Sequence, residues 1–334
     1  MTAVPMVELW RGGMLESQHR GHAVICGPNG ILEAWGDPET VIFPRSSCKM
    51  LQALPLIESG AAEAAGLSEA QLALACASHS GAAIHTDRVA HWLSDLGLAD
   101  SDLRCGAHMP SDPIANKALT CSDQPPCQIH NNCSGKHAGF LTLNRHLRGG
   151  PDYVDPLHPV QQAVKSAFEE VTGEPSPGFG IDGCSAPNFA TTVHGLARAM
   201  AFFAAATGTG NTRDRAAYRL IRAMMAFPEL VAGEGRSCTA LMRAMGGRVA
   251  VKTGAEAVFV AILPERRIGV ALKIVDGATR ASEAAITAIL MRLGALAAGD
   301  PVVATYLSGP LRNWRGMVTG DLRLAPGFCT PANP

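Results

Sequence analysis

Apolar and polar residues alternate near both ends of this chain. Residues 6–36 contain VELWRGG and HAVICGPNGILEAWG, in which GPNG between two apolar runs is a hairpin signal. Residues 247–275 hold three more strand-like runs, GRVAVKTG, EAVFVAIL and RIGVALKIV. Strand groups that lie so far apart in sequence predict an antiparallel sheet built from both chain ends.

The middle of the chain follows a helical pattern instead. Apolar residues recur there at three- and four-residue spacing, which predicts helices at 46–60, SEAQLALACA, IHTDRVAHWLSDLG, about 133–147, 158–171, 187–206 and 212–226. Ser68 and Gln71 have the spacing of a capping box. Residues 101–130 show little periodicity and predict a loop. A last long helix, ATRASEAAITAILMRLGALA, should pack on the sheet.

This order of elements predicts an α/β fold, with an antiparallel sheet flanked by helices and a helical inserted layer. We expect residues 1–334 to form a single catalytic unit. Its sheet layer should come from about 1–45 and 248–334, and its mainly helical middle from about 46–247. The sequence contains no low-complexity linker that would separate independent halves.

Composition narrows the class of protein. With 47% hydrophobic and 17% charged residues, the chain can bury a core. A net charge of -1 disfavours a nucleic-acid partner, which would select a basic excess. The start, MTAVPMVELWRGG, lacks the pattern of a targeting segment, and Arg292 interrupts the best apolar run. We therefore expect a soluble cytoplasmic protein without a membrane partner, whose ten cysteines are mostly reduced.

Two short motifs point to serine chemistry. In FPRSSCKMLQ, Ser46 precedes Lys49 by three residues, and a neighbouring amine can activate a serine hydroxyl. Late in the chain, Lys252 begins a KTG triplet on a predicted strand. Penicillin-recognising serine enzymes combine SxxK and KTG in this order. The plainer interpretation is a helix cap, a solvated lysine and a turn glycine.

Two further stretches could bind a metal or a substrate. HNNCSGKHAGF places Cys133, Lys136 and His137 on one helix face, where they could hold a metal or present a reactive thiol. GFGIDGCSAPNFA places Asp182 and Cys184 between glycines ahead of an apolar segment. A core cysteine and ordinary helix entries would explain both stretches equally well.

Taken together, these segments resemble the rhizobial-type L-asparaginases, the asparaginase II family. The matching stretches are FPRSSCKMLQALPL, LALACASHSG, HNNCSGKHAGFL, GIDGCSAPNFA and VKTGAEAVF. The resemblance implies a fold similar to serine β-lactamases and serine-type glutaminases, hydrolysis of L-asparagine to L-aspartate and ammonia, and a homodimer.

The resemblance also implies roles for individual residues. It gives two Ser-Lys pairs, Ser46 with Lys49 and Ser78 with Lys252. It places a Zn²⁺ site on Cys133, Lys136 and Cys184, which we expect to organise the substrate pocket rather than supply the nucleophile. The SxxK also contains Cys48, which need not be cysteine and could make the enzyme sensitive to oxidation.

In the expected mechanism, Ser46 attacks the side-chain amide and Lys49 takes its proton. Lys252 and Ser78 relay a proton to the departing ammonia. Asp182 should hold the substrate ammonium group, and Arg45 or His137 could help to position the substrate. Which serine attacks first stays open.

Three alternatives remain at this point. A glutaminase would share the whole chemistry. A β-lactamase-like hydrolase would share SxxK and KTG but would not need the two cysteines. A zinc-stabilised protein that binds a small amino acid would bind asparagine without releasing ammonia.

Overall fold

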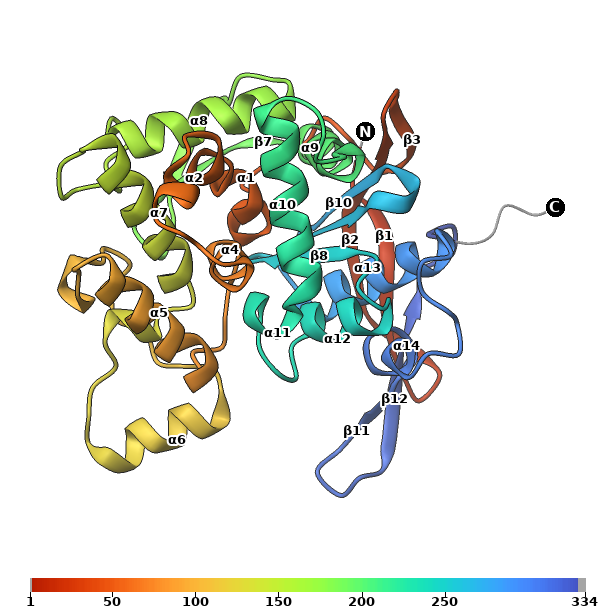
Figure 1. Cartoon of the computed structure of the whole chain (residues 1–334). Coiled ribbons are helices and arrows are strands. Elements are labelled where there is room, and N and C mark those ends of the chain that lie inside the picture. Colours follow the sequence, from red (N-terminus) through yellow and green to blue (C-terminus); the bar gives the residue numbers. More distant parts are fainter. Residues whose placement is uncertain (1, 330–334) are drawn as a thin grey trace. The chain divides into compact units, whose positions relative to one another are not determined.

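Strands from both ends of the chain join in one antiparallel sheet, as the alternation predicts. The computed structural model describes residues 2–329. The sheet order is β11-β12-β1-β2-β10-β9-β8, and β3 also pairs with β2 (Figure 1). The strands are β1 (Val4–Arg11), β2 (Met14–Gly27), β3 (Gly30–Trp35), β8 (Ala250–Gly254), β9 (Val258–Leu263), β10 (Ile268–Ile274), β11 (Pro310–Arg312) and β12 (Val318–Leu324).

Two compact units make up the chain. The first contains the described residues of Met1–Ser47, Thr192–Ala204 and Ala240–Pro334, and the second contains Cys48–Thr191 and Ala205–Thr239. The predicted α/β class, with an antiparallel sheet and a mainly helical middle, is confirmed. The single catalytic unit over residues 1–334 stays a prediction, and residues 1 and 330–334 lie outside the described residues.

The first unit packs helices on its sheet. Helix α13 (Thr279–Arg292) lies against β1, β9 and β10 (Figure 1). Helix α9 (Val193–Ala205) approaches β10 at Gly269, where a Cβ atom would lie 2.4 Å from the Ala197 carbonyl oxygen. The remaining elements assigned wholly to this unit are β4 (Val41–Ile42), η4 (Pro264–Arg266), α14 (Pro301–Val303) and η5 (Ala304–Ser308).

The second unit is built around helix α7 (Ser134–Leu147), which contacts α2, α3, α4, α5 and α8 (Figure 1). Every side chain of α7 from Ser134 to Asn144 is buried, as expected for a helix surrounded by others. The other helices are α1 (Lys49–Gln52), α2 (Leu54–Glu58), α3 (Ala61–Ala64), α4 (Glu69–Ala75), α5 (Ala83–Asp95), α6 (Pro113–Ser122), α8 (Pro159–Thr172), α10 (Thr212–Ala226) and α11 (Pro228–Val231).

Short elements complete this unit. Further elements lie where the chain passes from one unit to the other. Within it are η2 (Asp100–Asp102), η3 (Gln128–His130), β5 (Phe179–Ile181) and β6 (Pro187–Phe189). The passages contain η1 (Arg45–Cys48), β7 (Thr191–Thr192) and α12 (Ser237–Ala244). Within residues 2–329, no helix combines the length and apolarity needed to cross a membrane.

Most predicted helices are confirmed, including α8, α10 and the capping box at Ser68 and Gln71. The predicted loop at 101–130 is wrong in part, because it contains α6. Asp112 caps that helix by accepting a hydrogen bond from the Ala115 amide, and Pro113 occupies the first turn. No side chain of α6 is buried, so it leaves no apolar periodicity in the sequence.

The helix predicted at 187–206 is also wrong over its first residues. Pro187–Phe189 forms β6, which pairs with β5 in an antiparallel ribbon, and the helix begins only at Val193. Ser185, two residues before this strand, adopts a left-handed backbone conformation at φ 68. The apolar run satisfied either period, and pairing with a distant segment decided between them.

Candidate active site

Ser46 lies on a tight turn of the first unit. The turn is the 3₁₀-helix η1, and Ser46 is partly buried in it. The backbone of Arg45 is left-handed at φ 53, a conformation that costs a non-glycine residue energy and often marks functional sites. The Ser47 hydroxyl donates to the Pro44 carbonyl at 2.7 Å, which fixes the turn. The serine is thus presented by a shaped turn rather than by a regular helix.

The KTG triplet meets this turn within the same unit. A Cβ atom on Gly254 would lie 2.6 Å from the Pro44 carbonyl oxygen and 3.1 Å from the Ser47 amide nitrogen. A side chain at Gly254 would therefore displace the turn that carries Ser46. Lys252, two residues earlier on β8, is fully buried, and its Nζ donates to the Thr253 carbonyl at 2.7 Å. The KTG triplet thus meets the turn that carries Ser46 through backbone contact.

The boundary between the units falls between Ser47 and Cys48, so Lys49 belongs to the second unit. Lys49 is buried there, and its Nζ donates to the Ala77 carbonyl and to Cys133 Sγ, the latter at 3.1 Å. It thus contacts the residue before Ser78 and one of the two predicted metal-binding cysteines. This lysine is no solvated surface charge, which was the plainer interpretation of SxxK.

The loop that carries Ser78 is held by its backbone from two sides. The Ser78 amide donates to the Val231 carbonyl at 2.9 Å, and the His79 amide donates to the Asn132 carbonyl at 3.1 Å. Ser78 is itself buried. The loop therefore joins the end of α4 to the start of α7.

Cys133, Lys136 and Cys184, the three predicted metal ligands, lie in one cluster of the second unit. Cys133 occupies the N-cap position of α7, and Lys136 lies on the first turn. Lys136 Nζ donates to Cys184 Sγ at 3.1 Å and stacks over the Phe140 ring at 5.3 Å from its centroid. Gly135 between them is required, because a Cβ atom there would lie 2.5 Å from the Leu74 carbonyl oxygen.

Proton sharing polarises this cluster. Interaction with the neighbouring Cys133, helped by the charge of Lys136, lowers the pKa of the Cys184 thiol well below its usual value. The same interaction, with burial, raises the pKa of Cys133, whose Sγ donates to Asn132 Oδ1 at 3.0 Å. Burial alone would lower the pKa of Lys136, but attraction to the two sulfurs outweighs it and raises that pKa. Cys184 is therefore the more acidic of the two cysteines, and its sulfur lies beside the Lys136 amine.

His137 and Asp182 border the cluster. His137 is fully buried, and its Nδ1 hydrogen-bonds with the Tyr153 hydroxyl at 2.9 Å. Its Nε2 makes no hydrogen bond among the described residues, although the ring helps to lower the pKa of Cys184. Asp182 lies on the turn before Cys184, where its Oδ1 accepts from the Gly183 amide at 2.8 Å.

The donor set fits a zinc ion. Each sulfur has an amine beside it, Lys49 at Cys133 and Lys136 at Cys184, and thiolates are ligands of the kind that zinc prefers. Residues 2–329 bring together no group of three or more His, Cys, Asp and Glu side chains suited to a metal. A zinc site here would therefore need Lys136 as the third ligand, and binding would displace its proton.

Sequence reasoning missed one support of this cluster, Tyr153. Tyr153 accepts a hydrogen bond from the Arg104 amide at 2.8 Å and thereby holds His137. Nothing in its Gly- and Pro-rich surroundings marked it. The sequence identified Cys48 but could not show that it is buried. Burial raises the pKa of its thiol to about 12, so Cys48 stays protonated and is a poor nucleophile.

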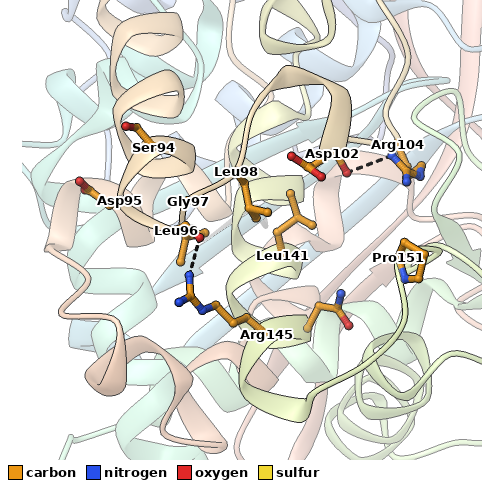
Figure 2. A pocket seen from close by; sticks show the side chains of 11 residues that line it. Ser94, Asp95, Leu96, Gly97, Leu98, Asp102, Arg104, Leu141, Arg145 and Pro151 are labelled. Atoms are coloured by element: carbon orange, nitrogen blue, oxygen red, sulfur yellow. Dashed lines mark hydrogen bonds between the residues drawn. The ribbon is translucent and has the colours of Figure 1, made fainter.

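A hollow of about 710 Å³ opens elsewhere in this unit (Figure 2). Figure 2 shows Arg145 pointing to a backbone carbonyl at the end of α5, while Arg104 Nη1 donates to the Asp102 carbonyl at 3.2 Å. The hollow borders the second half of α7, whereas Cys133 and Lys136 lie at the start of that helix. Its lining arginines are bonded to backbone carbonyls rather than gathered around the predicted chemistry.

Comparison with known proteins places the chain in a family. The family model described as L-asparaginase II matches residues 7–324. The chain therefore belongs to the L-asparaginase II family, and with it to the amide-hydrolysing enzymes. This confirms the resemblance found in the sequence. The search of curated proteins found no significant match.

Three solved structures have a distantly similar chain path. A β-lactamase from Mycobacterium bovis is 16% identical with a TM-score of 0.45, covering 83% of this chain and 95% of its own. Mglu is 14% identical with a TM-score of 0.48, covering 86% and 70%. The D-alanine carboxypeptidase AmpC from Burkholderia cenocepacia is 13% identical with a TM-score of 0.36, covering 77% and 88%. These values describe a distant likeness and assign no chemistry.

Proposed function

We propose that this enzyme hydrolyses L-asparagine to L-aspartate and ammonia through an acyl-enzyme. The observation that carries the proposal is the contact of Gly254 with the turn from Pro44 to Ser47. It joins the SxxK and KTG motifs, which are far apart in sequence, at the serine that we assign as nucleophile. Membership of the L-asparaginase II family supports the choice of substrate.

In the proposed first step, Ser46 Oγ attacks the side-chain amide carbon of asparagine. Lys49, three residues later and buried, accepts the hydroxyl proton. The C–N bond then breaks, and the nitrogen takes up a proton and leaves as ammonia. Water attacks the resulting ester, which releases aspartate and restores the Ser46 hydroxyl.

The second pair of the resemblance, Ser78 and Lys252, is assigned to proton delivery to the leaving ammonia. Ser78 is also the candidate nucleophile if Ser46 proves dispensable. Asp182 is assigned to the substrate ammonium, which needs a fixed negative charge. Arg45 is assigned to the substrate carboxylate, and His137 to positioning through the neighbouring cluster.

Zinc is part of the proposal. Cys133, Cys184 and Lys136 would hold it, and it would supply a fixed positive charge that orients the substrate. A homodimer is proposed from the resemblance alone. A cytoplasmic location is proposed because the ten cysteines, all within residues 2–329, form no disulfide, as a reducing compartment favours.

The test is ammonia release by the purified protein from L-asparagine and, separately, from L-glutamine, with and without added Zn²⁺. We expect release mainly from asparagine. Release mainly from glutamine would keep the serine chemistry and change the substrate. No release from either, together with measurable asparagine binding, would make the chain a binding protein and refute the proposal.

The Ser46→Ala variant should lower kcat by about 10³-fold or more, because no other atom can form the ester at that position. Ser282→Ala is the matched control. It removes another buried hydroxyl of the first unit, which donates to the Thr279 carbonyl at 2.9 Å, and should retain the rate. Near-normal turnover by Ser46→Ala would transfer the nucleophile role to Ser78.

A further inference from the structure

His79 is a buried imidazole for which the proposed reaction gives no role. Its side chain is 1% exposed and lies next to Ser78. Both ring nitrogens are engaged: the Gly81 amide donates to Nδ1 at 3.2 Å, and Nε2 lies 3.0 Å from the Ser134 hydroxyl oxygen. Because Nδ1 accepts, the ring proton lies on Nε2 and is donated to Ser134.

Ser134 makes a second hydrogen bond, to the backbone. Its hydroxyl donates to the Ile129 carbonyl at 2.8 Å, so it accepts from His79 and donates to the backbone before α7. Ser134 is the first residue of α7 and directly follows Cys133. The side chain of His79 therefore ties the loop of Ser78 to the turn that carries Cys133 and Lys136.

The surroundings keep the ring neutral and in place. His85 stacks on His79 with ring centroids 4.8 Å apart and an interplanar angle of 10°. His85 Nε2 is itself held at 2.8 Å by the Glu229 carbonyl. Burial, and then the neighbouring His85, lower the pKa of His79 well below its usual value. A neutral ring with both nitrogens occupied has no free site to accept a substrate proton.

We propose that His79 is a positioning residue, which sets the Ser78 loop against the first turn of α7 through its hydrogen bond to Ser134. The inference rests on the proposed function. The backbone anchors of the loop, from Val231 and Asn132, do not involve the ring. Loss of the ring should therefore misplace Ser78 without releasing the loop, and a misplacement of this kind can cost about 10²-fold in rate.

The experiment measures kcat and KM for L-asparagine in variants of this hydrogen bond. His79→Leu and Ser134→Ala should each lower kcat by about 10²-fold with little change in KM. The double variant should be no slower than the slower single variant, because both changes remove one contact. His79→Gln places an amide donor near the position of Nε2 and should restore most of the rate.

Thr142→Val is the matched control. It removes another buried hydrogen bond of α7, from Trp92 Nε1 to Thr142 Oγ1 at 3.1 Å, and should lower the unfolding midpoint while kcat is retained. If His79→Leu behaves like this control, with a lower midpoint and an unchanged kcat, the positioning role is refuted.

Nitrogen-edited NMR of the wild-type imidazoles separates this inference from the proposed function. It should show His79 protonated on Nε2, with a signal that Ser134→Ala shifts. Protonation on Nδ1 would overturn the hydrogen-bond assignment whatever the activity. A wild type that releases no ammonia would overturn the proposed function, and the role of His79 in the rate would fall with it.

Discussion

The most direct test of the cluster is removal of the Lys136 charge. In Lys136→Met the apolar stem can still pack on Phe140, but Cys184 loses the ammonium group 3.1 Å from its sulfur. At that separation and an effective dielectric constant of about 20, the attraction is roughly 5 kcal/mol. Cys184 can respond by binding a proton, so we expect a measured stability loss of about 3 kcal/mol.

The assay is urea unfolding of metal-free wild type and variant at neutral pH, with the ultraviolet absorbance of thiolates followed in parallel. The pKa of Cys184 should rise in the variant, and the thiolate signal at neutral pH should fall. Lys165→Met is the control, because Lys165 pairs with Glu169 at 2.8 Å on an open face of α8 and should contribute less than about 1 kcal/mol. A loss no larger than that of the control, with an unchanged thiolate signal, would refute the buried ion pair.

Two further predictions concern stability. Gly135→Ala should destabilise by about 1–3 kcal/mol in urea unfolding, since its Cβ would press on the Leu74 carbonyl. Gly139→Ala, whose Cβ would meet only side-chain atoms and none closer than 3.4 Å, should be neutral or stabilising. Equal effects of the two variants would contradict the close approach at Gly135. Acid should also destabilise the fold below about pH 6.5, because unfolding lets buried neutral histidines bind protons that the folded protein excludes. The histidines concerned are His79, His85 and His137, whose pKa values are lowered. An unfolding midpoint that does not change between about pH 7 and pH 5 would contradict these lowered pKa values.

The apolar pattern along the sequence predicted an element correctly where one apolar face of that element is buried. Helix α10 agrees with its predicted range of 212–226 because its apolar stripe packs on other helices. Helix α6 was missed because none of its side chains is buried. The strand β6 was assigned to a helix because its apolar run is short, and only its pairing with β5 distinguishes the two.

For the candidate site, too, some features follow from the sequence and others only from the structure. The sequence by itself determined the residue types: serine and lysine at SxxK, the KTG triplet, and a cysteine and lysine on one helical face. It also determined the family, because those motifs are long and specific. What it could not give was the environment of each side chain.

Only the tertiary structure decided which charges are buried and which partners they meet. Lys49 contacts Cys133 across many residues of sequence, and Lys136 contacts Cys184 in the same way. Gly254 has a place in KTG from the sequence, but only the fold shows that it lies against the turn of Ser46. The physical reason is that desolvation, proton sharing and close packing depend on neighbours in space, which periodicity along a chain does not encode.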